Sequence, residues 1–147
     1  MPTCREVMTR EPICAEPTDA VTRVAEIMKR EDVGSVPIVE SQSSRRLVGI
    51  VTDRDVVTKV VAGGRRVDQA TARDAMTADP VSCGEDEDVS RAMSLMAERQ
   101  IRRMPVVDGG GRLTGIIAQA DVATRVKSDA RTGQLVESIS EPRADRR

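Results

Sequence analysis

Residues 5–12 read REVMTREP, and residues 73–80 read RDAMTADP, which is nearly the same segment 68 positions later. The same spacing relates Pro37 to Pro105. After a loop that is two residues shorter in the second copy, the spacing becomes 66, so that LVGIV at 47–51 matches LTGII at 113–117. An internal repeat of this length usually marks a supersecondary unit that packs against its twin. We therefore expect two copies that share one core, with ligand sites in pairs near the pseudo-symmetry axis between them.

Each copy is predicted to fold as strand, helix, strand, strand, helix. In the first copy we expect a strand at 12–15, a helix capped by Thr18 or Asp19, strands at 36–39 and 47–51 around a hairpin loop at 41–44, and a helix from Asp53 to about Val61. The second copy should end in a helix from Gln119 to about Val126. The apolar stripe of the first helix follows the spacing of a buried helix face, with Val21, Val24, Ala25 and Met28 in one copy and Val89, Ala92, Met93 and Met96 in the other.

This alternation of strands and helices places helices against a small mixed sheet. The predicted fold class is α/β (α+β), with two β-α-β-β-α repeats packed with pseudo-two-fold symmetry and a cleft between them. We expect repeat 1 at 4–63, a linker at 64–71, repeat 2 at 72–127 and a polar C-terminal tail at 128–147.

Composition excludes several classes of function. The chain has 147 residues, a net charge of −1 and no Phe, Trp or Tyr. Nothing in this charge favours nucleic acid or an anionic membrane, and no aromatic platform is present on which single-stranded bases could stack. Histidine is absent, which removes the usual general base, so an enzyme is disfavoured, and a DNA-binding role is disfavoured further by the charge. No signal peptide or membrane-spanning run is visible, and we expect a cytoplasmic protein.

The three cysteines, Cys4, Cys14 and Cys83, are too few for a four-ligand zinc site without carboxylates, and we expect no metal. Cys14 and Cys83 fall one residue apart in the repeat register, so they could be neighbours in the fold. We interpret them as small buried hydrophobic residues of a reducing compartment rather than as a disulfide.

The sharpest local pattern is GIVTDRD at 49–55. The glycine permits close backbone approach within a strand, and the chain then enters a helix at Thr52. One interpretation is structural, because Thr-x-x-Asp is nearly a capping box that satisfies free helix N–H groups. The other is functional, because a hydroxyl and a carboxylate at a helix start suit a phosphate and a ribose diol. In the second copy Ala118 replaces the hydroxyl while Asp121 persists. Both interpretations stay open on these residues.

The repeat, the strands VGSVPIV at 33–39 and IRRMPVV at 101–107, and the GIVTDRD turn together resemble a tandem pair of CBS domains, a Bateman module. The resemblance covers roughly residues 4–127, and the layout is similar to stand-alone two-repeat bacterial proteins of the hypoxic-response type. It implies a regulatory module without catalysis that binds AMP, ADP, ATP or S-adenosylmethionine.

The resemblance also implies roles for individual residues. Asp55 would hold the ribose hydroxyls and Thr52 the phosphate of one site, with Asp53 in the same turn. Asp121 would hold the ribose of the other site, where Ala118 departs from the family pattern. The adenine slots would use Ile13, Cys14, Val36, Pro37 and Ile38, with Val81, Ser82, Met104, Pro105 and Val106 as counterparts. Candidate phosphate partners are Arg54, Arg102 and Arg103. Because first strands can cross between copies, the sequence does not assign a slot to an aspartate.

A second hypothesis is an interaction module with vestigial sites that works by dimerising or by docking on a partner. The valine-rich second helices, at 56–61 and 122–126, carry more apolar residues than a solvated helix needs. A homodimer closed by two-fold symmetry would bury them, and a regulated partner protein is expected in either case.

Overall fold

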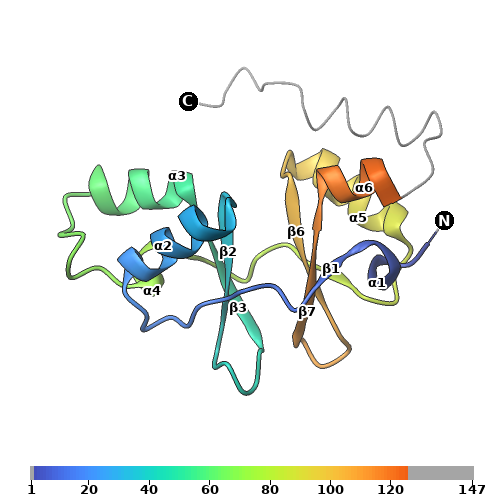
Figure 1. Cartoon of the computed structure of the whole chain (residues 1–147), viewed down its shortest axis with the longest axis horizontal. Coiled ribbons are helices and arrows are strands. Elements are labelled where there is room, and N and C mark those ends of the chain that lie inside the picture. Colours follow the sequence, from blue (N-terminus) through green and yellow to red (C-terminus); the bar gives the residue numbers. More distant parts are fainter. Residues whose placement is uncertain (1, 126–147) are drawn as a thin grey trace. The chain divides into compact units, whose positions relative to one another are not determined.

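The computed structural model describes residues 2–125 and shows a mixed α+β fold with two sheets, which confirms the predicted fold class (Figure 1). The described chain forms two compact units. The Asp55 unit comprises residues 11–80 and 109–113, and the Asp121 unit comprises residues 2–10, 81–108 and 114–125. These units therefore do not follow the two sequence repeats, because each contains a segment from the other copy.

The Asp55 unit is built around a three-stranded antiparallel sheet of order β2-β3-β4. Its elements are α2 (Val21–Glu31), β2 (Ser35–Val39), β3 (Leu47–Thr52), α3 (Asp53–Asp55), the π-helical segment η1 (Val56–Val61), α4 (Ala72–Ala75) and β4 (Thr77–Ala78). The predicted strand at 12–15 is not formed, and only Ala15 makes an isolated parallel bridge, to Ile38 of β2.

The Asp121 unit is built around a four-stranded sheet of order β1-β7-β6-β5. Its elements are α1 (Cys4–Val7), β1 (Thr9–Arg10), β5 (Cys83–Gly84), α5 (Val89–Arg99), β6 (Arg103–Val107), β7 (Leu113–Ala118) and α6 (Gln119–Arg125). Strand β5 runs parallel to β6, as the segment at Ala15 does to β2. The predicted polar tail lies outside the described residues.

The start of each repeat is exchanged. The short helix and strand α1–β1 pair with the last strand of the second copy, Thr9 with Ile116, whereas α4–β4 pair with the last strand of the first copy, Thr77 with Ile50. A cation fastens each exchanged helix at its C-terminal end, because Lys59 donates to the Ala75 carbonyl and Arg125 donates to the Val7 carbonyl. Positive side chains favour this end of a helix.

Two glycines make this exchange possible. A Cβ atom at Gly49 would lie 3.1 Å from the Thr77 carbonyl oxygen, and one at Gly115 would lie 2.9 Å from the Thr9 carbonyl oxygen. Each glycine therefore admits the exchanged strand against the last strand of the unit, which confirms the close backbone approach predicted from GIVTDRD.

Most of the predicted helix stripe lies in the core, although Ala25 is exposed and Met28 is only half-buried. All four predicted residues of α5 are buried: Val89, Ala92, Met93 and Met96. In α2 the third buried position is Ile27 and not Ala25, which is exposed, because the buried face of this helix is narrower than predicted.

The predicted N-cap of α2 was also wrong. The N-cap is Ala20 and makes no side-chain cap bond, whereas the Asp19 carboxylate turns back to accept the Glu16 N–H at 2.8 Å. The local turn at residues 16–19 therefore competes successfully for the carboxylate. In the second copy Asp88 does cap its helix, by accepting the Ser90 N–H.

The helix predicted from Asp53 to Val61 begins with one α-turn and continues as η1. Its counterpart begins at Gln119 as predicted and is described to Arg125. In the described part of the chain no helix is long and apolar enough to cross a membrane.

Candidate functional site

The Thr52 turn carries both halves of a capping box. The Thr52 hydroxyl oxygen accepts the Asp55 N–H at 3.1 Å, and Asp55 Oδ2 accepts the Thr52 N–H at 2.9 Å. The structural interpretation is therefore confirmed at this turn. The capping box leaves the Thr52 hydroxyl free to donate, since among the described residues no acceptor takes its hydrogen.

Lys59 neutralises the second oxygen of Asp55, because its Nζ lies 3.2 Å from Oδ1 in an i,i+4 pair. The Asp55 side chain is only 15% exposed, while Lys59 is 41% exposed. The lysine also donates to the Thr77 hydroxyl at 3.4 Å, so a residue of the exchanged strand β4 lies next to this pair. A carboxylate oxygen has two lone pairs, which leaves Asp55 able to accept one more donor on this side.

Ser35 places a further hydroxyl beside Thr52. The two residues are directly opposite each other on β2 and β3, which puts their side chains on the same face of the sheet. The Ser35 hydroxyl is buried and has no hydrogen-bond partner in the described structure. A buried polar group without a partner requires an explanation, and a bound polar ligand or water is one.

The second turn reaches a similar shape with fewer local contacts. Asp121 Oδ2 accepts the Ala118 N–H at 3.3 Å, which repeats half of the capping box. Ala118 offers no hydroxyl, but Thr9 of the exchanged strand β1 donates to the same Asp121 oxygen at 3.4 Å. The hydroxyl that the second copy lacks in sequence is therefore supplied from the first copy.

The remaining residues of the turns are exposed or half-buried. Asp53 is exposed, and its Oδ1 accepts the Arg54 N–H at 2.8 Å. One backbone hydrogen bond joins each turn to the residue that precedes strand β2 or β6. The Asp53 N–H donates to the Gly34 carbonyl, and the Gln119 N–H donates to the Arg102 carbonyl. Arg102 and Arg103 thus begin the strand beside the Asp121 turn, where Arg103 takes the place of Ser35.

The two predicted adenine slots are now assigned to units. Ile13 and Cys14 belong to the Asp55 unit, while Val81 and Ser82 belong to the Asp121 unit with Arg103 to Val106. Four of these residues belong to the main core cluster of their own unit, namely Val36 and Ile38 in one and Met104 and Val106 in the other. Pro37 and Pro105 are buried, whereas Val81 and Ser82 are half-buried. Ile13 is the exposed member of the first set, at 45%.

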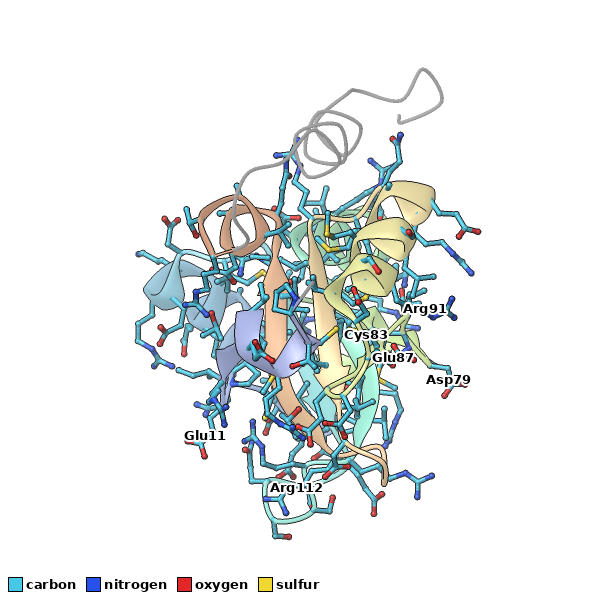
Figure 2. The ribbon with its side chains drawn as sticks, turned by 90° about the vertical axis from the view of Figure 1, so that its right-hand side faces the viewer. Glu11, Asp79, Cys83, Glu87, Arg91 and Arg112 are labelled. Carbon is cyan, nitrogen blue, oxygen red and sulfur yellow. The ribbon has the colours of Figure 1, made fainter. Side chains whose placement is uncertain are left out.

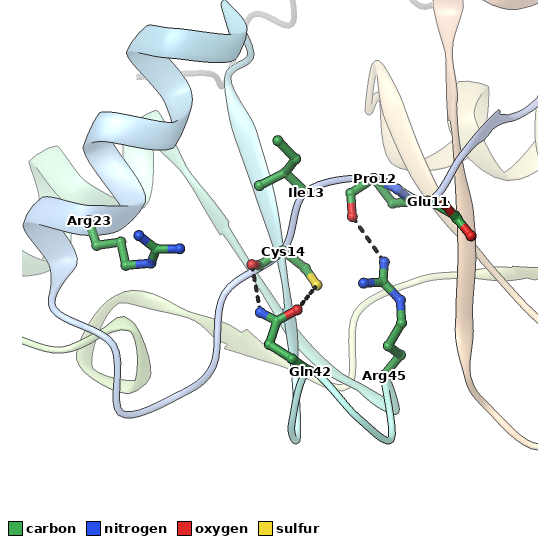
Figure 3. A pocket seen from close by; sticks show the side chains of 7 residues that line it. All are labelled: Glu11, Pro12, Ile13, Cys14, Arg23, Gln42 and Arg45. Carbon is green, nitrogen blue, oxygen red and sulfur yellow. Dashed lines mark hydrogen bonds between the residues drawn. The ribbon is translucent and has the colours of Figure 1, made fainter.

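Ile13 and Cys14 line a pocket of about 490 Å³ at the hairpin side of the Asp55 unit (Figure 3). Glu11, Pro12, Arg23, Gln42 and Arg45 complete it. Gln42 donates to the Cys14 carbonyl at 3.0 Å, and Arg45 donates to the Pro12 carbonyl at 3.0 Å. Burial raises the pKa of the Cys14 thiol above its ordinary value. The pocket lining does not include Thr52 or Asp55, so the structure separates these two groups of predicted site residues.

Sequence reasoning did not identify Ser35, Thr9 or Lys59. A signal existed for Thr9, because Met-Thr recurs at 8–9 and 76–77 in both copies. Lys59 and Arg125 are also related by the 66-residue spacing. No local pattern marks Ser35, because its lack of a partner is a property of the folded chain. Over residues 2–125, no three His, Cys, Asp or Glu side chains gather into a group that fits a metal ion.

The family model described as the CBS domain matches residues 4–62 and 72–128. The chain belongs to the CBS-domain family. The two matches correspond to the two sequence repeats, so each compact unit combines parts of both CBS repeats.

Two similar proteins illustrate this membership. An uncharacterized protein of Methanopyrus kandleri, MK0525, is 38% identical over 80% of this chain, which spans only 59% of that protein's length. Hypoxic response protein 1 of Mycobacterium tuberculosis is 32% identical, with 98% of both chains covered. Hypoxic response protein 1 is a stand-alone tandem CBS protein, and its similarity to the present chain extends over nearly the full length of both.

Two solved structures show the same fold. A crystal structure of Hypoxic Response Protein I with two coordinated zinc ions covers 85% of this chain and 99% of its own, with a TM-score of 0.77 and 31% identity. The CBS pair of protein MJ0100, in complex with 5′-methylthioadenosine and S-adenosyl-L-methionine, covers 84% of this chain and 94% of its own, with a TM-score of 0.72 and 25% identity.

Proposed function

We propose that the chain is a regulatory module without catalysis of its own that binds an adenosine-type ligand, AMP, ADP, ATP or S-adenosylmethionine, and transmits the bound state to a partner protein. The observation that carries the proposal is the gathering of three groups at one end of the β2–β3 hairpin. These are the Asp55 carboxylate, the Thr52 hydroxyl and the buried Ser35 hydroxyl without a partner. The ligands of the MJ0100 CBS pair support the adenosine class.

Each group suits one part of such a ligand. The Asp55 carboxylate is suited to the ribose diol, and it can accept a ribose hydroxyl without losing Lys59. The hydroxyls of Thr52 and Ser35 can donate to a phosphate or carboxylate oxygen. The base would lie against aliphatic side chains, in keeping with a chain that has no aromatic residue.

We further propose that the site at Asp55 binds a phosphorylated ligand more tightly than the site at Asp121. The Thr52 hydroxyl keeps its hydrogen for a ligand, whereas the Thr9 hydroxyl donates its hydrogen to Asp121. One hydrogen bond to a charged group contributes about 1.5–3 kcal/mol, which is roughly one to two decades in affinity. Arg102 and Arg103, at the strand start beside the second turn, oppose this ranking.

Calorimetric titration of the full chain with AMP, ATP and S-adenosylmethionine tests the proposal. We expect Asp55→Ala to remove the tighter binding event and Asp121→Ala to remove a weaker one. The matched control is Asp68→Ala, which deletes an exposed linker carboxylate paired with Arg66. If Asp121→Ala removes the tighter event and Asp55→Ala does not, the two sites are reversed. If none of the three ligands binds, the nucleotide-sensing proposal is wrong.

We also propose that the chain forms a homodimer. A homodimer is expected as well under the alternative hypothesis, an interaction module with vestigial ligand sites. Val57 and Val61 of η1 are 58% and 59% exposed. Two large apolar side chains on one short segment favour burial against a second copy by two-fold association.

Light scattering at micromolar concentration should give the mass of a dimer. The double substitution Val57→Lys, Val61→Lys should give a monomer, because it places charge in the contact. A monomeric mass for the unsubstituted chain would exclude the homodimer.

A further inference from the structure

Two thiols that lie far apart in sequence meet inside the Asp121 unit. Cys83 opens β5 and Cys4 opens the exchanged helix α1, and the Cys83 Sγ donates to the Cys4 Sγ at a distance of 3.5 Å. Cys4 is 0% exposed and Cys83 is 2% exposed. Figure 2 shows Cys83 close to Glu87. Glu87 lies in the loop between β5 and α5, and carbonyl groups of this loop accept the backbone N–H groups of Cys4 and Arg5 in α1. The sequence register suggested Cys14 as the neighbour of Cys83, whereas the thiol in contact is that of Cys4.

The surroundings restrict what these thiols can react with. Both belong to the apolar core of the unit, together with Val7, Met8 and Val89. The remaining cysteine, Cys14, lies in the Asp55 unit, where its thiol donates to the Gln42 side chain at 3.5 Å. Among the three cysteines, Cys4 and Cys83 are therefore each other's reaction partner.

The hydrogen bond makes the two thiols unequal. Because Cys83 donates to Cys4, the pKa of the Cys4 thiol lies below its ordinary value, although burial and the carboxylates of Glu87 and Asp88 act in the opposite direction. The same hydrogen bond, and then burial, raise the pKa of the Cys83 thiol. The thiolate is the nucleophile in thiol oxidation, which gives Cys4 the role of the attacking residue.

Access to the pair depends on the exchanged segment. Helix α1 is one turn long, and its N-cap Thr3 makes no side-chain cap bond. Two backbone hydrogen bonds hold this helix: the Cys4 N–H donates to the Glu87 carbonyl, and the Arg5 N–H donates to the Glu85 carbonyl. The Arg5 side chain also forms ion pairs with Glu85 and Asp86. Helix α1 covers both thiols, and local opening of this one-turn helix exposes them together.

We propose that Cys4 and Cys83 form a peroxide-responsive oxidation site that closes to an intramolecular disulfide. The Cys4 thiolate attacks one oxygen of hydrogen peroxide, which breaks the O–O bond, forms a sulfenic acid and releases hydroxide that takes up the thiol proton as water. The Cys83 sulfur then attacks the sulfenic sulfur, which forms the S–S bond and expels a second water. The two thiols lose two electrons and two protons, and the peroxide gains them.

This disulfide would fasten the exchanged segment covalently to β5. The same segment supplies β1 to the sheet and the Thr9 hydroxyl to Asp121, so the redox state of the pair governs how firmly the second turn is completed. The bond closes a long loop, from residue 4 to residue 83, and long loops restrict the unfolded chain most. We expect the melting temperature of the oxidised chain to rise by about 5–15 °C.

The test is to treat the full chain with one equivalent of hydrogen peroxide and then with an alkylating reagent in denaturant. Peptide mapping should show the Cys4 peptide linked to the Cys83 peptide, with Cys14 alkylated, and dithiothreitol should reverse both the link and the rise in melting temperature. Alkylation of all three cysteines after peroxide, or a disulfide between two chains, would overturn the proposal.

Matched variants separate the pair from the third cysteine. Cys14→Ser should keep the linkage and the rise in melting temperature, whereas Cys4→Ser should lose both. Should Cys4→Ser fail to fold, the peptide map of the unsubstituted chain decides by itself. A rise in melting temperature of Cys4→Ser on peroxide treatment, equal to that of the unsubstituted chain, would contradict the assignment.

Discussion

The turns at Thr52–Asp55 and Ala118–Asp121 occupy the same position in their CBS repeats but are held by different contacts. In the first, Thr52 and Asp55 satisfy each other's backbone N–H groups. In the second, Asp121 accepts the Ala118 N–H, and the hydroxyl comes from Thr9 of the other repeat. The carboxylate therefore forms the turn in both copies, whereas the hydroxyl can be local or exchanged.

The largest expected effect concerns the glycines that admit the exchanged strands. Gly115→Ala and Gly49→Ala should each lower the free energy of unfolding by about 1–3 kcal/mol, because an added Cβ overpacks the strand contact. The loss should be larger at Gly115, where the nearest backbone oxygen lies at 2.9 Å and not 3.1 Å. Urea denaturation measures the difference. Gly109→Ala is the control, since its Cβ meets nothing within 4 Å, and an equal loss at Gly109 would remove the steric explanation.

Substitutions at the two N-cap positions, Thr52 and Ala118, should change the free energy of unfolding by a smaller amount. Thr52→Ala should lower the free energy of unfolding by about 1 kcal/mol, because the Asp55 N–H loses its acceptor. Ala118→Thr should raise it by up to about 1 kcal/mol by completing the second box. Thermal and urea denaturation of both variants, alone and combined, measure these changes. A loss of stability in Ala118→Thr would show that Thr9 already occupies the space for that hydroxyl.

The smallest effect concerns the two exchanged helices. At α4 the Asp74 carboxylate accepts the Thr71 N–H at 2.9 Å, which holds the pKa of Asp74 below its ordinary value, with Arg65 at 3.3 Å acting in the same direction. A lowered folded-state pKa stabilises the fold above the unfolded pKa of about 3.9, and this contribution is lost as the pH falls through the folded value.

Asp74→Asn should therefore lower the melting temperature at pH 7, and this effect should be smaller at about pH 2, where the folded carboxyl is being protonated. At α1 the matched variant is Glu6→Gln. The Glu6 carboxylate accepts a hydrogen bond from the exposed Thr3 hydroxyl at 3.2 Å. Because this contact is exposed, the substitution should change the melting temperature little at pH 7. An effect of Asp74→Asn that is the same at both pH values would contradict this account.

The sequence alone supported a large part of this structure. The period of the repeat, the apolar stripes and the turn residues predicted the α+β class, the strands β2, β3, β6 and β7 and the starts of the helices at Asp53 and Gln119. These features depend on contacts within a few residues, where helix and strand periodicities and turn residues act directly. The roles proposed for Thr52, Asp55 and Asp121 also follow from local pattern and from family resemblance.

Only the tertiary structure decided which segments complete each unit. The exchange of α1–β1 and α4–β4, the meeting of Thr9 with Asp121 and the pairing of Cys4 with Cys83 join residues 27 to 112 positions apart. No local pattern encodes such contacts, because they depend on how two strands share an edge and which side chains then fill the core. The burial of Val36 and Ile38, and the Ser35 hydroxyl without a partner, follow from the same packing. The sequence determined the repeating unit and its turns, and long-range packing determined which atoms stand beside them.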